Sequence, residues 1–261
     1  MDDPKFWVKK VVDLDTGEKK IAKLSYFEAF ESSIGGVKIR RFRNPEKEAE
    51  IIKQMKDHPH FMHGTSYHDT KGNNVRVLDI VYGHGFFDYI HSLNMDYDAY
   101  FRTELPGVLR KLVKAFEAIR FLHANGFKHG DIRNDHIIIE RNTGNYVWID
   151  FDYDYETDEN PYGLDVFGLG NILMYAIGKG FHHSHEIKRN TAYKDLKYLM
   201  EANDVSILDR GRFINLRKLY PIIPKMLNDI LMHFSMDTSV FYEFAEEIVE
   251  DLTICLYSVF E

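Results

Sequence analysis

The residues whose types and spacing could support chemistry lie near the middle of the chain. Asp131 follows a predicted amphipathic helix, Asp150 follows a short apolar run, and Asp152 comes two residues later. A helix, a polar loop and a β-hairpin in this order can bring Asp131 and Asp150 to one cleft. Phosphoryl transfer needs such a pair, because one carboxylate orients or deprotonates the attacking hydroxyl while the other holds the magnesium ion that neutralises phosphate charge. The pattern therefore predicts a phosphoryl-transfer site.

Length and composition indicate a folded protein. The chain has 261 residues, of which 44% are hydrophobic and 14% aromatic, enough to bury a sizeable core as one large domain or two lobes. The 33 basic and 41 acidic residues give a net charge of −8, which is the wrong sign for a protein whose main partner is nucleic acid. The single cysteine, Cys255, can form neither an intramolecular disulfide nor a cysteine-based zinc site.

Two stretches bear on where the protein resides. The amino terminus, Met1–Lys5, is acidic and has no apolar stretch behind it, so we expect no secretory signal. The longest uncharged apolar run, Val166–Gly178, is well short of the roughly 18 residues that a membrane helix needs. We therefore expect a cytoplasmic protein with no membrane partner.

The first third of the chain is strand-like and rich in turns. Two β-hairpins closed by Gly, Asn and Asp turn residues are predicted, and their strands include Phe6–Leu14, Lys19–Leu24 and Val75–Tyr82. Between them, Asn44 and Pro45 suit the cap and the first position of a helix whose first turn is rich in glutamate. A shorter helix is predicted over Ser25–Ser33, where a serine and a glutamate have capping-box spacing.

From Gly83 onward the sequence is mainly helical. Apolar residues at three-and-four spacing predict helices over Leu109–Leu122, Leu164–Ile177 and Ile223–Phe234. The sequence therefore predicts an α+β fold with two lobes. Residues 1–82 are expected to form a small lobe with an antiparallel β-sheet and one main helix. Residues 83–261 are expected to form a larger helical lobe. The crevice between the lobes is the expected ligand site.

Three motifs, taken in order, resemble those of the protein-kinase-like superfamily. His129-Gly130-Asp131, followed five residues later by His136, is similar to the catalytic loop H-R-D-x-x-x-x-N, and Asp150-Phe151-Asp152 is similar to D-F-G. The stretch around Asp165 resembles the helix whose aspartate braces the catalytic loop. The resemblance covers most of the chain and implies the bilobal kinase fold.

The resemblance also implies roles for the residues of these motifs. It makes Asp131 the catalytic base and Asp150 the magnesium ligand, and it places Arg133 where many members have a lysine that supports the transferred phosphoryl group. His136 replaces the usual asparagine, and a neutral imidazole is a poorer ligand than an amide oxygen for a hard ion such as magnesium. Manganese, or a single metal ion, is therefore an alternative. Asp152, in place of glycine, adds a third acid that could take over the missing coordination.

Upstream, the resemblance points to a nucleotide site. Lys23 is similar to the strand lysine that contacts the nucleotide phosphates, and Glu48 is similar to the helix glutamate that pairs with it. A rival alignment makes Lys38 or Arg40 the phosphate contact instead. The segment that ends in Val81-Tyr82 resembles the one that hydrogen-bonds adenine through its backbone.

Three departures from the kinase pattern affect the expected function. No G-x-G-x-x-G precedes Lys23, so the loop that covers the phosphates is missing or replaced. Asp165 follows Asp150 by only 15 residues, without an A-P-E, which leaves no room for the long segment that docks peptide substrates. Gly130 replaces the arginine that would read a phosphorylated activation loop.

These observations lead to two hypotheses. The first is an ATP-dependent phosphotransferase that uses Mg²⁺ or Mn²⁺ and transfers the γ-phosphoryl group to a hydroxyl acceptor, as an atypical serine/threonine kinase or a small-molecule kinase. The alternative is a pseudokinase, a nucleotide-binding or scaffolding module without turnover, which the missing glycine-rich loop and His136 favour. The identity of the acceptor, a small molecule or a protein, stays open.

Overall fold

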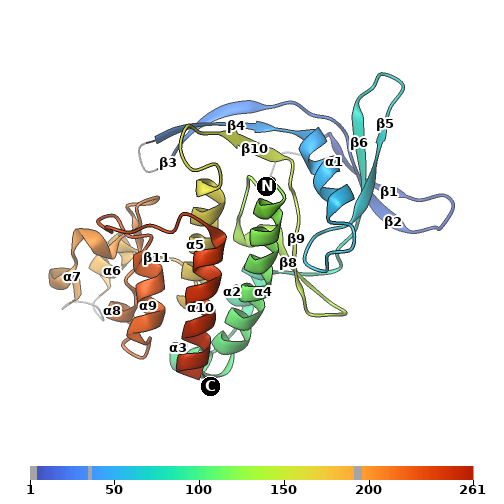
Figure 1. Ribbon diagram of the computed structural model, residues 1–261. Helices are drawn as coiled ribbons and strands as arrows, with labels where there is room; N and C mark the ends of the chain where they lie inside the picture. The colour runs from blue at the N-terminus through green and yellow to red at the C-terminus, as the bar shows by residue number, and fades with distance from the viewer. Residues whose placement is uncertain (1–4, 35–36, 191–195, 261) are drawn as a thin grey trace.

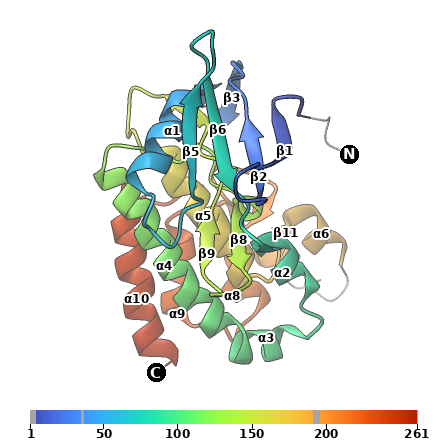
Figure 2. The same cartoon turned by 90° about the vertical axis from the view of Figure 1, so that its right-hand side faces the viewer.

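A twisted antiparallel sheet forms the core of the amino-terminal part of the molecule. A computed structural model describes residues 5–34, 37–190 and 196–260 (Figure 1). The sheet has the strand order β1-β2-β6-β5, and its strands are β1 (Val8–Val12), β2 (Lys19–Lys23), β5 (Gly64–His68) and β6 (Asn74–Asp79). Helix α1 (Pro45–Gln54) packs beside β5 and β6, and Figure 2 shows β1 at the sheet edge away from it. The two predicted hairpins are confirmed.

The predicted start of α1 is also confirmed. The side chain of Asn44 accepts a hydrogen bond from the Lys47 backbone N–H at 3.1 Å, and Pro45 occupies the first turn, where no backbone donor is needed. The acidic residues of the first turn lie at the positive end of the helix dipole.

A second hairpin lies between β2 and α1, where the short helix over Ser25–Ser33 was predicted. That prediction is wrong, because strands β3 (Ala29–Ile34) and β4 (Val37–Arg43) pair there instead. β4 also pairs with β10 (Tyr153–Glu156), which follows the Asp150-Phe151-Asp152 motif, so the sheet order is β10-β4-β3. Pairing with a strand more than 100 residues away overrides the local capping-box pattern.

Helices make up most of the remaining chain. The long helices are α4 (Leu105–Ala124), α5 (Gly163–Ile177) and α10 (Ala245–Phe260), with α9 (Lys225–Met232) beside them, so the predicted helices are confirmed. The shorter elements are β7 (Gly83–Gly85), α2 (Phe86–Ser92), α3 (Tyr97–Thr103), η1 (Asn134–His136), β8 (Ile137–Glu140), β9 (Tyr146–Trp148), β11 (His182–His183), α6 (Ser184–Arg189), α7 (Leu196–Leu199), η3 (Ala202–Asp204), β12 (Arg212–Phe213) and α8 (Leu216–Leu219).

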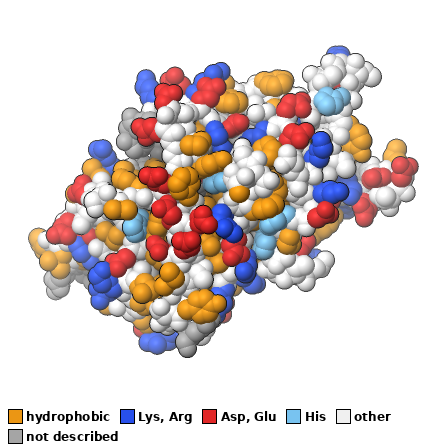
Figure 3. All heavy atoms as spheres, in the orientation of Figure 1, with side chains coloured by type: hydrophobic (Ala, Val, Ile, Leu, Met, Phe, Trp, Pro, Cys, Tyr) orange, Lys and Arg blue, Asp and Glu red, His pale blue; other side chains and the backbone are white. Residues whose placement is uncertain are grey.

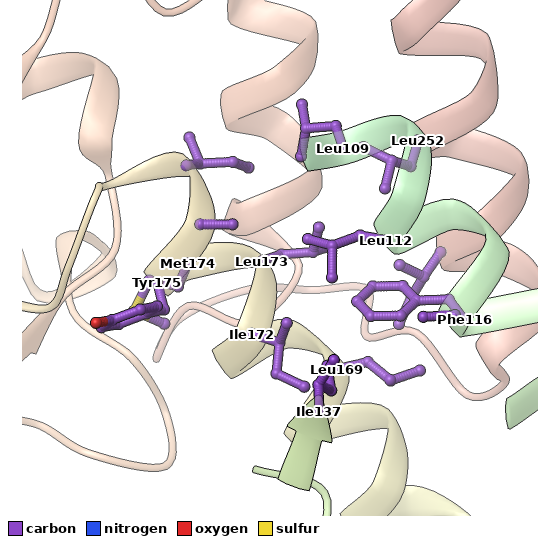
Figure 4. Packing of buried hydrophobic residues seen from close by; sticks show 14 of the residues in the cluster. Leu109, Leu112, Phe116, Ile137, Leu169, Ile172, Leu173, Met174, Tyr175 and Leu252 are labelled. Carbon is purple, nitrogen blue, oxygen red and sulfur yellow. The ribbon is translucent and has the colours of Figure 1, made fainter. Parts of the chain in front are cut away.

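The hydrophobic core of the helical part is centred on α5. Its side chains meet those of α4, α10 and the start of β8, as Figure 4 shows for Leu173 beside Leu112 and for Leu169 beside Ile137. Nearly every residue of α5 after its first turn is buried, which explains its almost uncharged sequence. Within the described residues, no helix has the length and apolar character needed to cross a membrane.

The two parts together give the predicted α+β architecture. Figure 1 shows β1 to β6 and α1 gathered in the upper part of the molecule and most of the helices below them. On the face in Figure 3, acidic and basic side chains are interspersed, as expected for a chain with 33 basic and 41 acidic residues. Strand β10 crosses from the helical part to the amino-terminal hairpin, so the segment after Asp150 is held by both parts.

Candidate active site

A buried ion-pair network joins the sheet to α1. The ammonium Nζ of Lys23 on β2 lies 2.8 Å from Oε1 of Glu48, and Nε of Arg76 on β6 lies 2.9 Å from Oε2 of the same carboxylate. All three side chains are at most 4% exposed. Each oxygen of Glu48 therefore has its own cation, which compensates for the burial of the charge and sets the position of α1 against the sheet.

Lys23 also reaches the acidic motif that follows β9. Its Nζ lies 2.5 Å from Oδ1 of Asp150 and 3.3 Å from Oδ2 of Asp152. Burial alone would lower the pKa of Lys23, but the charges of Glu48, Asp150 and Asp152 outweigh it and raise that pKa. Burial would likewise raise the pKa of Asp150, and the charges of Lys23 and His136 hold it below its usual range. Both groups therefore stay charged at neutral pH.

The backbone of Asp150 has φ of 70°, in the left-handed region that aspartate tolerates better than most residues. The next residue, Phe151, is fully buried and packs edge-on against Phe61 and His129. Anchoring this ring fixes the turn that directs the Asp150 carboxylate toward Lys23.

Asp152 is 1% exposed and faces cations. Its Oδ2 accepts a hydrogen bond from Nη1 of Arg43, on β4, at 2.8 Å, in addition to its contact with Lys23. The Arg43 guanidinium lies 4.1 Å from the ring centroid of Tyr153 and also contacts Glu28. The structure therefore places the third acid beside Asp150, with one of its oxygens already shared by two cations.

The predicted catalytic loop, which contains His129, Gly130 and Asp131, is held in place by Asp165 on α5. The Asp165 carboxylate accepts hydrogen bonds from the backbone N–H groups of His129 and Gly130 at 2.7 and 2.9 Å, and its Oδ2 lies 3.0 Å from Nε2 of His123. Burial would raise the pKa of Asp165, but the His123 contact and these donors hold it below its usual range. His129 is fully buried, and desolvation lowers its pKa to about 3, so its ring is neutral.

The glycine at position 130 has a steric cause. Its φ is 85°, and a Cβ atom there would lie 1.9 Å from the carbonyl oxygen of Tyr153 on β10. No other residue fits while β10 runs so close to the loop. Glycine is therefore required at position 130 because β10, which pairs with β4, runs so close to the loop.

Asp131 has a partner that the sequence did not suggest. Nη2 of Arg41, on β4, lies 2.7 Å from Oδ1 of Asp131 and 2.9 Å from the Gly130 carbonyl oxygen. Sequence reasoning considered strand residues 37–40 only as a rival phosphate-binding strand. The Asp131 side chain is 9% exposed, and its Oδ2 lies 3.5 Å from Nδ1 of His136.

The other two catalytic-loop residues differ in placement. Nδ1 of His136 lies 2.8 Å from the Asp131 carbonyl oxygen, and its Nε2 lies 3.7 Å from Oδ2 of Asp150. His136 is therefore located between the two acids. Arg133, in contrast, forms a two-pronged contact with Asp135 at 2.6 and 2.9 Å, and its side chain is 57% exposed. The structure brings His136 to the acidic pair but leaves Arg133 facing outward.

A cavity of about 250 Å³ opens beside Lys23 and Asp150. Its apolar lining comes from both parts of the chain and comprises Val8, Ile21, Met62, Leu78, Ile80, Val81, Ile138 and Ile149. Of the two residues predicted to contact adenine, Val81 lines this cavity, whereas Tyr82 is 55% exposed and does not line it. Of the basic residues considered for the phosphate contact, Lys23 lines the cavity, and Lys38 and Arg40 do not.

Comparison with known proteins bears on this arrangement. The chain matches no protein-family model. It is 22% identical over 189 residues to a calcium/calmodulin-dependent protein kinase type I of Schizosaccharomyces pombe, covering 71% of this chain and 50% of that protein. It is 27% identical over 142 residues to a probable myosin light chain kinase of Dictyostelium discoideum, covering 54% and 40%. The chain thus spans half or less of the length of these curated relatives.

Solved structures extend the likeness over nearly the whole chain. The structure of Rad53 residues 1–466 in complex with AMP-PNP superposes with a TM-score of 0.56 at 16% identity, covering 94% of this chain and 60% of that one. The Cydia pomonella granulovirus kinase PK-1 superposes with a TM-score of 0.55 at 14% identity, covering 94% of both chains. This chain has the protein-kinase fold. The likeness to the protein-kinase-like superfamily, noted from the motifs, is confirmed.

The kinase fold allows a test of whether the residues present fit a metal ion. Among the described residues, no group of three or more His, Cys, Asp or Glu side chains is arranged to hold one. Magnesium at phosphoryl-transfer sites is held by one or two carboxylates together with the substrate phosphates, so a protein cage is not required. Asp150, with His136 at 3.7 Å, fits such a site, since its side chain is 28% exposed at the cavity.

Proposed function

We propose that the protein is an ATP-dependent phosphotransferase that transfers the γ-phosphoryl group to a hydroxyl acceptor. The observation that carries this proposal is the contact of Lys23 with both Glu48 and Asp150, at 2.8 and 2.5 Å, beside an apolar cavity. A lysine, a helix glutamate and a metal-binding aspartate are the parts that kinase-type phosphoryl transfer needs in place together. The kinase fold and the kinase relatives support the assignment.

In this proposal each residue has one task. The adenine ring occupies the apolar cavity near Val81, and Lys23 contacts the phosphates. Asp150 and His136 would hold a metal ion, Mg²⁺ or Mn²⁺, whose charge would offset that of the phosphates. Asp131 accepts the proton of the acceptor hydroxyl, and Oδ2, the oxygen that Arg41 does not occupy, is the atom available for it.

The acceptor is a small molecule or a protein recognised in an unusual way. Support comes from the segment after Asp150, which forms β10 within three residues and is paired along its length with β4. A segment held in this way does not offer the long platform on which peptide substrates dock. If the acceptor is a protein, we propose that the hydroxyl belongs to a serine or threonine side chain, and identification of the acceptor tests this.

The first test is thermal unfolding with ATP and either Mg²⁺ or Mn²⁺. A ligand that binds only the native state raises the melting temperature by mass action, with a stabilisation of about 2.7 kcal/mol at 100 times Kd. We expect a metal-dependent rise in the wild type and its loss in Asp150→Asn. Asp158→Asn, an exposed acid in the same segment, is the matched control and should retain the rise.

The second test separates turnover from binding. Asp131→Ala should keep the metal-dependent rise in melting temperature and lose about 10²–10⁴-fold in phosphoryl transfer, the usual contribution of a general base. Undiminished transfer in this variant would contradict the role of Asp131. Absence of any thermal shift at millimolar ATP would instead favour the pseudokinase. His136 and the lack of a glycine-rich loop in the sequence are the observations that support this alternative.

A further inference from the structure

The residues just before β1 line the nucleotide cavity. Lys5 and Trp7 contribute to its wall together with Lys23, Arg43 and Asp150. In this fold a glycine-rich loop would supply backbone N–H groups to the phosphates at the strand pair ahead of the lysine. Here β1 and β2 are joined by the turn Asp13–Glu18, which does not line the cavity. The cavity wall is instead completed by two side chains with N–H donors.

Contacts on three sides hold Trp7 in place. Its carbonyl oxygen accepts a hydrogen bond from the backbone N–H of Leu24, directly after the lysine strand, at 2.8 Å. Its ring stacks on Tyr26 with a centroid distance of 4.1 Å and an angle of 13°, and the Arg43 guanidinium lies 5.1 Å from the ring centroid. The ring is therefore ordered without any help from its own N–H group.

Within the described part of the chain, the donors of Trp7 and Lys5 have no hydrogen-bond partner. The indole Nε1–H of Trp7 is enclosed and makes no hydrogen bond with the described residues, an arrangement that is unfavourable unless a ligand accepts it. The ammonium of Lys5 is in no hydrogen bond or ion pair with the described residues either. Lys23 and Arg43, in contrast, are already engaged by carboxylates.

We propose that Lys5 and the indole N–H of Trp7 bind the phosphates of the nucleotide, in place of a glycine-rich loop. This inference rests on the proposed ATP site. Phosphate oxygens are strong acceptors, and an ammonium without a partner among the described residues, at the same cavity as a fixed N–H donor, suits them. A further cation at this site would reduce the repulsion between the phosphates and the carboxylates of Asp150 and Asp152, which are only partly offset by Lys23 and Arg43. The charge of Lys5 is among those that lower the pKa of Asp150, after the larger effects of Lys23 and His136. This agrees with the position of Lys5 at the same cavity as Asp150.

The test compares the binding of ATP with Mg²⁺ and of adenosine by titration calorimetry. Lys5→Ala and Trp7→Phe should each raise the Kd of ATP about three- to tenfold and leave the Kd of adenosine unchanged within about twofold. Trp7→Phe removes the N–H but retains a ring against Tyr26 and Arg43. Lys9→Ala is the matched control, because Lys9 is an exposed lysine of β1 that does not line the cavity, and it should bind ATP as the wild type does.

The outcomes separate this inference from the proposed function. Wild-type affinity for ATP in both Lys5→Ala and Trp7→Phe would overturn the inference and leave the ATP site intact. An equal loss of ATP and adenosine binding would also overturn it, because the segment would then shape the cavity rather than hold phosphates. A wild-type protein that binds neither ligand would refute the ATP site itself. Thermal unfolding of each variant without ligand shows whether it is folded. If Trp7→Phe does not fold, the binding data for Lys5→Ala decide the test.

Discussion

The proposed nucleotide side of the cleft, around Lys23, and its proposed acceptor side, around Asp131, are held together by different kinds of contact. On the nucleotide side, Lys23, Glu48 and Arg76 are joined by ion pairs between side chains. On the acceptor side, the catalytic loop is held mainly through its backbone, as when Asp165 accepts hydrogen bonds from two N–H groups. An ion pair between side chains requires particular residue types at both positions, whereas a hydrogen bond to the backbone requires one at a single position, because backbone groups are present in every residue.

Three contacts on the acceptor side distinguish this protein and can be broken one at a time. They are the close approach of Gly130 to β10, the contact of Arg41 with Asp131, and a set of hydrogen bonds from Lys47 to backbone carbonyls. All three join the catalytic loop to the β3–β4 hairpin, to β10 or to α1. If the two sides are held independently, loss of any of these contacts should destabilise the loop around Asp131 and leave the Lys23–Glu48 ion pair intact.

The largest effect is expected for Gly130→Ala. Its Cβ would lie 1.9 Å from a backbone oxygen of Tyr153, and its φ of 85° strains any residue but glycine, so we expect a loss of about 3 kcal/mol or more in the free energy of unfolding. Gly144→Ala is the control, because φ is 69° there but the nearest atom is the movable Lys111 ammonium at 3.2 Å. It should cost about 1–2 kcal/mol. Equal losses in urea denaturation would show that β10 does not press on the loop.

The sequence revealed the nucleotide side better than the acceptor side. On the nucleotide side, Lys23, Glu48 and Asp150 were identified as candidates from motif order, and the structure joins all three through Lys23. Arg76, the second cation on Glu48, was missed there. On the acceptor side, Asp131 was identified, and His136 lies between it and Asp150. Arg41 was missed, because its partner Asp131 lies 90 residues further along the chain and no local pattern links them.

The β3–β4 hairpin shows the same limit. Ser25 and Glu28 have the spacing of a capping box, a local signal, and the strand state depends on pairing with β10, a distant one. The one usable signal was Gly130 in place of arginine. A glycine at a position that is otherwise a large side chain indicates that something approaches the backbone, although not what it is.

An intermediate effect is expected for Arg41→Gln, and β4 supplies its own control. Arg41 is 18% exposed and gives charge-assisted hydrogen bonds to Asp131 and Gly130, so its loss should cost about 1.5–3 kcal/mol of stability. Arg40, the preceding residue, pairs with Glu156 and is 60% exposed, so Arg40→Gln should cost about 0–1 kcal/mol. Amide hydrogen exchange should also speed up in residues 153–156 only for Arg41→Gln. Similar exchange in both variants would mean that the Asp131 contact does not hold β10.

The third effect, which is at most about 1.4 kcal/mol per pH unit, concerns Lys47, the neighbour of Glu48 on α1. The Lys47 ammonium donates hydrogen bonds to the carbonyl oxygens of Lys128 at 2.9 Å and of His129 at 3.1 Å, and also to that of Tyr153. It is buried, and desolvation lowers its pKa from 10.5 to about 8 in spite of nearby acids. One lysine thus links α1, the catalytic loop and β10 by contacts to backbone oxygens.

The folded protein releases the Lys47 proton near pH 8, and the unfolded chain keeps it until about pH 10.5. Between these values the unfolded state binds more protons, so the contribution of Lys47 to stability rises with pH, by at most about 1.4 kcal/mol per pH unit. Lys47→Met removes this rise, and the difference in unfolding free energy between wild type and variant should grow from pH 8 to pH 10. Lys53→Met, on the exposed face of α1, should run parallel to the wild type. Parallel curves for all three proteins would mean that the Lys47 ammonium is as well solvated as that of Lys53. In that case Lys47 would not hold the backbone carbonyl groups of the loop and of β10.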